Sequence, residues 1–369
     1  MSVMNPPPVI DPDALIRGID NLLLTCMQLK AEETVLLVTE PEHELMYSRT
    51  IPHKVAARIQ KLNAEVALYE HPLVSGVGDF SLELVAKMKR VDHVLFLSRI
   101  GDYSRFMPFS DSAKKTQCYA LDEAMFASHY AGACYQLMTG LHQKLETELM
   151  QAKEWRIRCP LGTDLSGTFC WPSLQGGVDE DFSLNMFPVT TFKPIPCNTA
   201  HGRVALSRWL MPGAAVKVEP ARIYLESTVM AEVQDGLIAE FTGTANDVQA
   251  VNEHYDRVAN TLGINRNRVH SWHAGLNPHT FFTGCIVNDL DRWEGLSFAS
   301  PRYLHLHTCG DIAPSEISWS VFNPTVEIDG ETWWQDGQLV WYRRPDNMEL
   351  IRPVAGGDCL LEPSQCIKV

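Results

Sequence analysis

Three residues in one stretch of the C-terminal half could bind a metal ion. His305 and His307 stand in an alternating run at 303–308, and Glu316 follows them within residues 302–318. Every second side chain of a β-strand points to the same face, so the two imidazoles would project together. Imidazole and carboxylate groups bind zinc, manganese and ferrous iron without selecting among them. The pattern predicts a site for one divalent transition metal (Mn, Fe or Zn), unless the histidines are an ordinary half-buried pair.

The residues around this pair could return Glu316 to it. Cys309-Gly310-Asp311 is typical of a turn, and Pro314-Ser315-Glu316 leads into a second predicted strand at 317–322. Glu316 would then lie at the same end of the sheet as the histidines. It could serve either as a metal ligand or as a catalytic base.

A second pair of histidines lies in residues 266–278 (RNRVHSWHAGLNP). On a strand, Ser271 and His273 share a face while His270 points to the other, so His273 is the better ligand candidate. The alternative is a histidine that packs beside Trp272 and bonds to a backbone carbonyl. Arg266, Arg268 and Arg302 flank the two groups of histidines, and a guanidinium can hold a carboxylate bidentately. They favour an anionic substrate, although each could instead be a solvated surface charge.

The first half of the chain alternates predicted helices and strands. Short apolar runs typical of buried parallel strands occur at 33–39, 64–69 and 92–98, and helical periodicity occurs at 13–30, 42–62, 82–89 and 121–150. This order predicts an open parallel α/β domain over residues 1–150, with a structural or oligomeric role. Glu40-Pro41-Glu42 follows the first strand in place of a Gly-rich phosphate loop, which argues against nucleotide binding.

Residues 151–369 are rich in strand and turn signals instead. Residues 222–240 predict a hairpin that turns at Gln234-Asp235-Gly236, and residues 246–262 predict a helix with Thr244 as its N-cap. We therefore expect a C-terminal α+β domain with antiparallel sheets that carries the metal site. The fold class is α/β, with the parallel domain first.

Composition narrows the possible partners. The 369 residues are 45% hydrophobic and 21% charged, a globular balance, and the formal net charge is −14 with a pI near 5.4. Nucleic acids and acidic membranes bind surfaces on which Lys and Arg are clustered, so neither is expected as a partner. Ten Cys residues without a CxxC motif suit reduced thiols. Without a signal-like apolar segment, we expect a cytoplasmic protein.

Several landmarks resemble a known family. Gly162-Thr163-Asp164-Leu165, Met211-Pro212-Gly213, Glu219-Pro220 and the segment 274–278 (AGLNP) are similar, in order and spacing over roughly residues 156–341, to the thermophilic metallo-aminopeptidases of the aminopeptidase T and S type. The resemblance implies a scaffold shared with 2,5-dihydroxypyridine 5,6-dioxygenase, a non-haem iron enzyme, and with 5-nitroanthranilate aminohydrolase. It also implies a homo-oligomer.

The candidate ligands depart from the pattern of that family. Ser271 stands where the peptidases have Glu and the dioxygenase has His, and Glu316-Ile317-Ser318 replaces an HxD motif that supplies ligands in both. A set of His273, His305 and His307, completed by Glu316, could compensate. The sequence around Cys309 and Glu316 resembles the aminohydrolase branch best.

These observations predict a metal-dependent hydrolase that degrades a small anionic aromatic or heteroaromatic compound. The resemblance to the aminohydrolase branch implies that it replaces an aromatic amino group with hydroxyl. The alternatives are an Fe(II) ring-cleaving dioxygenase for a hydroxylated pyridine or aromatic ring, a metallo-aminopeptidase, and a binding module without catalysis. The residues expected to contact the substrate are Arg266, Arg268, Arg302, Ser271 and Trp272.

Overall fold

The chain divides into two compact units. Unit 1 comprises residues 1–138, 180–189 and 354–359, and unit 2 comprises residues 139–179, 190–353 and 360–369. The structure is a computed structural model that describes residues 10–41, 46–72, 80–104, 112–171, 184–213, 218–312 and 315–368. Pro314 of the predicted turn and the predicted helix start at Glu42 lie outside these residues.

Unit 1 is built on a five-stranded parallel sheet. Its strands are β1 (Thr34–Thr39), β2 (Glu65–Glu70), β3 (His93–Leu97), β4 (Lys114–Cys118) and β7 (Asn185–Phe187). They lie in the order β2-β1-β3-β4-β7, and each neighbouring pair is parallel. β3 is buried along its whole length, which explains its continuous apolar sequence. The predicted parallel α/β architecture is confirmed.

The helices of the first 151 residues are shorter than their periodicity predicts. They are α1 (Pro12–Asp20), a π-helical turn η1 (Asn21–Cys26), α2 (Ile51–Lys61), α3 (Leu82–Met88), α4 (Ile100–Ser104), α5 (Glu123–Phe126), α6 (His129–Gly132) and α7 (Tyr135–Gln151). The predicted helix over 121–150 is three helices because the Ser128 hydroxyl accepts a hydrogen bond from the Tyr130 N–H and starts a new helix, and because Ala133 is extended.

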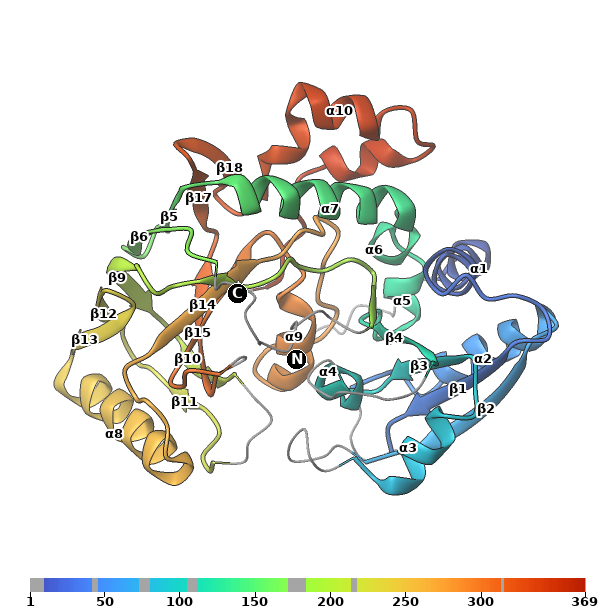
Figure 1. The fold of residues 1–369 in the computed structure, drawn as a ribbon, viewed down its shortest axis with the longest axis horizontal. Helices are drawn as coiled ribbons and strands as arrows, with labels where there is room; N and C mark the ends of the chain where they lie inside the picture. The colour runs from blue at the N-terminus through green and yellow to red at the C-terminus, as the bar shows by residue number, and fades with distance from the viewer. Residues whose placement is uncertain are drawn as a thin grey trace, which may run out of the picture. The chain divides into compact units, whose positions relative to one another are not determined.

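Unit 2 contains two antiparallel sheets. The six-stranded sheet has the order β11-β10-β16-β15-β14-β8. Within it, β14 and β15 lie side by side (Figure 1). Its strands are β8 (Ile195–Pro196), β10 (Trp209–Pro212), β11 (Ile223–Tyr224), β14 (Val269–Ala274), β15 (Tyr303–Thr308) and β16 (Ile317–Phe322). The antiparallel character predicted for this part of the chain is confirmed.

The eight-stranded sheet packs against one face of the first. Its order is β13-β12-β9-β6-β5-β17-β18-β19. Its strands are β5 (Glu154–Arg158), β6 (Asp164–Thr168), β9 (His201–Leu206), β12 (Val229–Gln234), β13 (Leu237–Thr242), β17 (Thr325–Ile328), β18 (Glu331–Gln335) and β19 (Gln338–Leu339). Trp155 on β5 and Trp272 on β14 meet edge to face, with ring centroids 5.5 Å apart, and Phe192 contacts Trp272 at 5.8 Å. Aromatic packing of this kind stabilises the core between the sheets.

The hairpin and the long helix of unit 2 form as the sequence predicts. Asp235 and Gly236 both have positive φ (50° and 71°), as the tight two-residue turn between β12 and β13 requires, and a Cβ on Gly236 would lie 2.4 Å from the Cys197 carbonyl oxygen. The helix α8 (Ala245–Leu262) begins after Thr244, whose hydroxyl accepts from the Asp247 N–H. The structure also describes the helices α9 (Leu290–Ser297) and α10 (Pro345–Ile351) and the 3₁₀ segments η3 (Val340–Arg343) and η4 (Gly357–Leu361).

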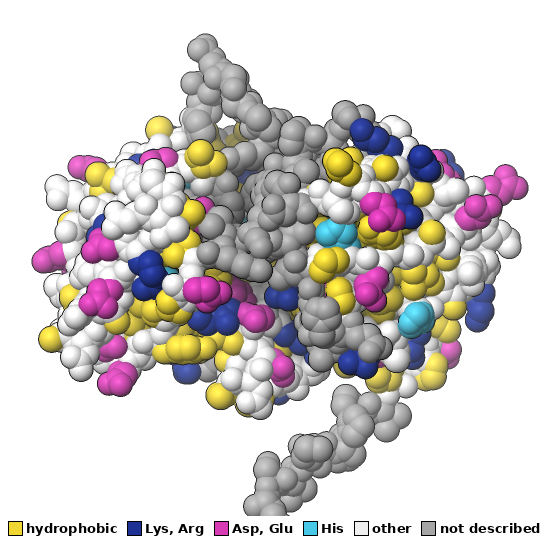
Figure 2. Space-filling view, turned by 90° about the horizontal axis from the view of Figure 1, so that it is seen from below, with side chains coloured by type: hydrophobic (Ala, Val, Ile, Leu, Met, Phe, Trp, Pro, Cys, Tyr) yellow, Lys and Arg dark blue, Asp and Glu magenta, His cyan; other side chains and the backbone are white. Residues whose placement is uncertain are grey.

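Two surface properties bear on possible partners. Among the described residues, no helix is both long enough and apolar enough to cross a membrane. On the face drawn in Figure 2, acidic side chains are interspersed with basic ones.

The start of α8 generates a prediction about acid stability. The Asp247 carboxylate accepts hydrogen bonds from the Ser227 hydroxyl, from the Glu226 and Ser227 N–H groups and from the Thr244 hydroxyl, and these lower the pKa of Asp247 to about 2. Because the pKa is lower in the folded chain, this stabilisation is present above pH ~4 and is lost as the pH falls toward 2.

Thermal unfolding of Asp247→Asn should show this loss. The variant should unfold at a lower temperature than the wild type near neutral pH, and the difference should shrink as the pH falls below ~4. Asp235→Asn, in the exposed hairpin turn where Asn tolerates positive φ, is the matched control. A wild-type to D247N difference that is constant with pH would contradict the assignment.

Candidate metal centre

Three histidines of unit 2 share one face of the six-stranded sheet. In the antiparallel pairing of β14 with β15, His273 lies opposite His305 and Ser271 lies opposite His307. Directly paired residues point to the same side of a sheet, as do residues two apart on one strand. The imidazoles of His273, His305 and His307 therefore project together.

A β-bulge is responsible for this register. Val269 pairs with Thr308, yet the next pair is Ser271 with His307, so His270 is an extra residue on β14. Without it, continuation of the Val269–Thr308 register would place His273 opposite Leu304, on the face that points away from His305. Bulges re-aim side chains in this way beside functional sites. The sequence argument anticipated which residues share a face but not this extra residue.

The three ring nitrogens converge on one point. The Nε2 atoms of His273 and His305 are 2.5 Å apart, and those of His273 and His307 are 3.2 Å apart. Ligand nitrogens that surround zinc at about 2.0–2.1 Å stand roughly 3 Å from one another. The convergence has the size of a metal coordination shell, and three imidazoles form a donor set that fits zinc, manganese or ferrous iron.

The hydrogen bonds at Nδ1 of His273 determine which ring nitrogen carries the proton. Its Nδ1 lies 2.9 Å from the Thr191 hydroxyl oxygen and 3.2 Å from the Phe192 carbonyl oxygen. A carbonyl only accepts, so Nδ1 carries the proton and donates. In the neutral ring, Nε2 then carries the lone pair, which is the form that ligates a metal.

Burial of the three rings is unequal. His273 and His307 are buried, whereas His305 is half-buried. On the same face, β16 places Ser318 opposite His307 and Ser320 opposite His305. Three serines, Ser271, Ser318 and Ser320, thus lie beside the histidines, and all three are buried. The surroundings of the centre are rich in hydroxyl groups.

Glu316 is not among the residues whose ligand atoms converge. The group in which all ligand atoms lie within 4.8 Å of one another contains His273, His305 and His307. Glu316 precedes β16, and its N–H donates to the carbonyl oxygens of Thr308 and Cys309. Its side chain is half-buried, and this burial raises its carboxyl pKa. A role as base remains a prediction.

The three predicted substrate arginines have partners elsewhere in unit 2. Arg266 donates to Asp256, Asn252 and Asn267 and lies over the Tyr255 ring. Arg268 donates to Asn198 and pairs with Asp311 at 3.6 Å. Arg302 donates to Asn323 and to the Ser364 and Gln365 carbonyls. None of these contacts involves the three histidines, and the substrate role of the arginines stays a prediction.

The two other predicted substrate residues, Trp272 and Ser271, lie on opposite faces of β14. Trp272 is fully buried and points into the core between the two sheets, away from the face that carries His273. The structure does not bring its ring together with the three histidines. Ser271 lies on the histidine face, opposite His307, and its hydroxyl is 2.9 Å from His270 Nδ1.

Sequence reasoning missed Thr191. It lies 82 residues from His273 in the chain, in a segment (189–192, VTTF) without a metal-binding motif. Only the folded sheet brings the two together. A regular spacing signal could not have identified it.

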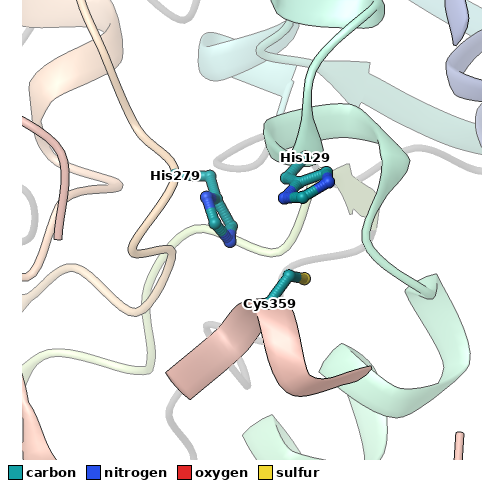
Figure 3. Close-up of side chains that lie close together, drawn as sticks. All are labelled: His129, His279 and Cys359. Atoms are coloured by element: carbon teal, nitrogen blue, oxygen red, sulfur yellow. The ribbon is translucent and has the colours of Figure 1, made fainter. Parts of the chain in front are cut away.

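A second pair of potential ligands lies within unit 1. His129 is the first residue of α6 and Cys359 belongs to η4, and their ligand atoms lie within 4.8 Å of each other. Figure 3 shows both side chains, together with His279, which belongs to unit 2. Because zinc sites in proteins use three or four ligands, we assign no metal to this pair.

Comparisons with known proteins identify the fold. No protein-family model matches the sequence, and no curated protein matches it either. Among solved structures, 2,5-dihydroxypyridine dioxygenase from Pseudomonas putida KT2440 superposes with a TM-score of 0.60 and 13% identity, over 92% of this chain and 100% of that one. The chain shares the fold of this dioxygenase. The likeness confirms, at the level of the fold, the resemblance that the sequence motifs predicted.

A second solved structure is less similar. AmpT from Thermus thermophilus has a TM-score of 0.49 and 12% identity, with 89% of this chain and 99% of that chain covered. At 13% identity, the likeness to the dioxygenase shows the fold alone. The site itself has to be argued from the residues of this chain.

The convergence of three Nε2 atoms predicts which substitutions remove metal. His273→Ala or His307→Ala should lower the metal content of reconstituted protein from about one ion per chain toward zero, because two imidazoles are too few for a stable site. The content is measured by elemental analysis after reconstitution with zinc, manganese or ferrous iron and gel filtration.

His201→Ala is the control, because His201 is exposed on β9 and is not part of the converging group. This variant should keep its metal. If H307A retains full occupancy, His307 does not belong to the ligand set.

Proposed function

We propose that the protein is a metal-dependent hydrolase that acts on a small anionic aromatic compound and replaces a ring amino group by hydroxyl. The observation that supports it is the convergence of the His273, His305 and His307 Nε2 atoms on one face of the six-stranded sheet. In balanced form, the ring amine and water give the ring hydroxyl and ammonia. The reaction needs no oxidant.

The charge of the ligand set favours hydrolysis. A divalent metal held by three neutral imidazoles keeps its full double charge, and such a centre polarises substrate oxygen and lowers the pKa of a coordinated water toward 7. Ferrous oxygenases typically use two histidines and one carboxylate, which cancels part of that charge. Within the described residues, the converging group contains no carboxylate.

The residues of the chain around the centre could bind and orient a polar ring. Ser318 and Ser320 lie across from His307 and His305, where their hydroxyls could meet ring substituents. Tyr303 stacks on His305, with centroids 5.6 Å apart, and its hydroxyl is 2.9 Å from the Ser320 hydroxyl. With the three arginines held elsewhere, the double charge of the centre would attract the anionic group of the substrate.

Glu316 is the proposed base. It lies two residues before Ser318 on the approach to β16, and burial raises the pKa of its carboxyl group. A carboxylate with a raised pKa accepts a proton more readily, which suits the removal of a proton from an attacking water.

The second candidate is a ring-cleaving dioxygenase that uses ferrous iron. The fold shared with 2,5-dihydroxypyridine dioxygenase favours it. The same histidines would hold the metal, and the substrate would be a hydroxylated pyridine or a related ring. No contact of the described residues specifically favours the metallo-aminopeptidase alternative.

Oxygen dependence separates the two candidates. Metal-reconstituted protein is offered nitro-substituted aminobenzoates and hydroxylated pyridines, with and without oxygen, and ammonia release and oxygen uptake are recorded. We expect ammonia release at the same rate under argon, because water supplies the new hydroxyl. Turnover that consumes oxygen and stops under argon would establish the dioxygenase instead.

Glu316→Gln tests the base. The amide cannot accept the proton, so the rate constant for ammonia release should fall by about 10²-fold or more. The metal content should not change, because Glu316 is outside the converging group. Glu253→Gln, on the exposed side of α8, is the control. If E316Q loses its metal, Glu316 is a ligand and not only a base.

A further inference from the structure

We infer that Thr191 is a positioning residue that fixes the tautomer and orientation of His273 and thereby sets the affinity of the centre for metal. The inference rests on the proposed metal centre and adds a residue that does not itself touch the ion. It follows from three hydrogen bonds whose directions can be assigned.

The Thr191 hydroxyl has one proton, and the Ala274 carbonyl oxygen receives it at 3.0 Å. A carbonyl cannot donate, so the direction of this bond is fixed. The hydroxyl oxygen then meets His273 Nδ1, 2.9 Å away, as an acceptor. The Phe192 carbonyl oxygen accepts from the same Nδ1 at 3.2 Å. The Thr191 hydroxyl oxygen and the Phe192 carbonyl oxygen both act as acceptors toward Nδ1, so Nδ1 carries the proton.

Thr191 is itself held in place. It is fully buried, and its backbone forms an isolated antiparallel bridge with Gly275. The His142 side chain on α7 bonds to the Thr191 backbone, and the Lys193 N–H donates to Glu146, one turn further along α7, at 2.9 Å. Because the segment is anchored at both the sheet and the helix, the hydroxyl is a rigid acceptor rather than a mobile one.

A rigid acceptor at Nδ1 has two effects on the opposite nitrogen. It holds the proton on Nδ1, so that Nε2 presents its lone pair, and it orients the ring so that this lone pair points toward His305 and His307. Partners of this kind typically change metal affinity by 10–100-fold. Since the Phe192 carbonyl remains when the hydroxyl is removed, we expect a loss of about tenfold.

The test compares zinc affinity in variants of the full chain. Thr191→Val keeps the shape of the side chain and removes the hydroxyl, and Thr191→Ser keeps the hydroxyl. Zinc dissociation constants are measured by competition with a chromophoric chelator, and folding is checked by thermal unfolding. We expect T191V to bind zinc about tenfold more weakly than the wild type. The zinc dissociation constant of T191S should lie within about threefold of the wild-type value, a smaller change than that expected for T191V.

Thr308→Val controls for the loss of a buried hydroxyl. Thr308 lies on β15, next to His307 but on the opposite face, and its hydroxyl bonds to Tyr255 and to the Ile317 carbonyl. T308V should lower the unfolding temperature and leave zinc affinity near the wild-type value. An equal loss of affinity in T191V and T308V would overturn the positioning role, because general destabilisation would then explain both.

A spectroscopic measurement decides the tautomer directly. In metal-free wild-type protein with ¹⁵N-labelled histidine, the neutral ring of His273 should carry its proton on Nδ1. Its signals are assigned by their loss in His273→Gln. A proton on Nε2 would overturn the inference. If T191V does not fold, Thr191→Ala provides the same hydroxyl loss with a smaller side chain.

These results separate the two levels of the proposal. If wild-type protein binds no zinc, manganese or ferrous iron, the metal centre and the function that depends on it both fail. If the wild type binds zinc tightly and T191V binds it equally tightly, only the role of Thr191 fails. Tight wild-type binding that T191V weakens and T191S preserves supports the inference.

Discussion

The bulge at His270 is the constraint on which the site depends. A strand has a side-chain period of two, so one extra residue moves all the residues that follow it to the other face. On β14 that shift brings His273 opposite His305 and sends Trp272 into the layer between the two sheets, against Trp155. The packing of Trp272 and the placement of His273 are two consequences of one register. The aromatic core therefore stabilises the same arrangement that gathers the histidines.

Burial makes this arrangement sensitive to its polar partners. A buried polar group costs roughly 1–3 kcal/mol when its hydrogen bond is lost, so the polar atoms around His273 must be satisfied. Thr191 meets two such needs at once, since its hydroxyl donates to the Ala274 carbonyl and accepts from the His273 ring. The hydroxyl that donates to the backbone of β14 also accepts from the Nδ1 of His273 on the same strand. The Thr191 hydroxyl thus serves both the backbone of the sheet and the proposed metal centre.

Local patterns predicted the parts of the molecule that local chemistry determines. The run at 303–308 alternates, the Asp235-Gly236 pair suits a tight hairpin turn, and Thr244 caps α8; each is decided by neighbours in sequence. Other contacts join distant segments. The pairing of β14 with β15 brings together residues 32 apart, and the Thr191–His273 contact joins residues 82 apart. No periodicity in the sequence predicts either contact. The partners of Arg268 and Arg302, such as Asn198 and Ser364, likewise come from distant parts of the chain, so the sequence alone did not indicate these contacts.

The chemistry of the centre follows from the charge that its ligands leave on the ion. A carboxylate at position 318, opposite His307, would join the ligand set through the register of β15 and β16, but the chain has Ser318 there. A hydroxyl is a neutral and weak donor, so the centre would keep the charge of the ion, and its attraction for an anionic substrate would increase. That attraction offers an explanation for how an anion could be bound although Arg266, Arg268 and Arg302 are engaged elsewhere. The same replacement that departs from the peptidase pattern would thus contribute to the recognition of an anion.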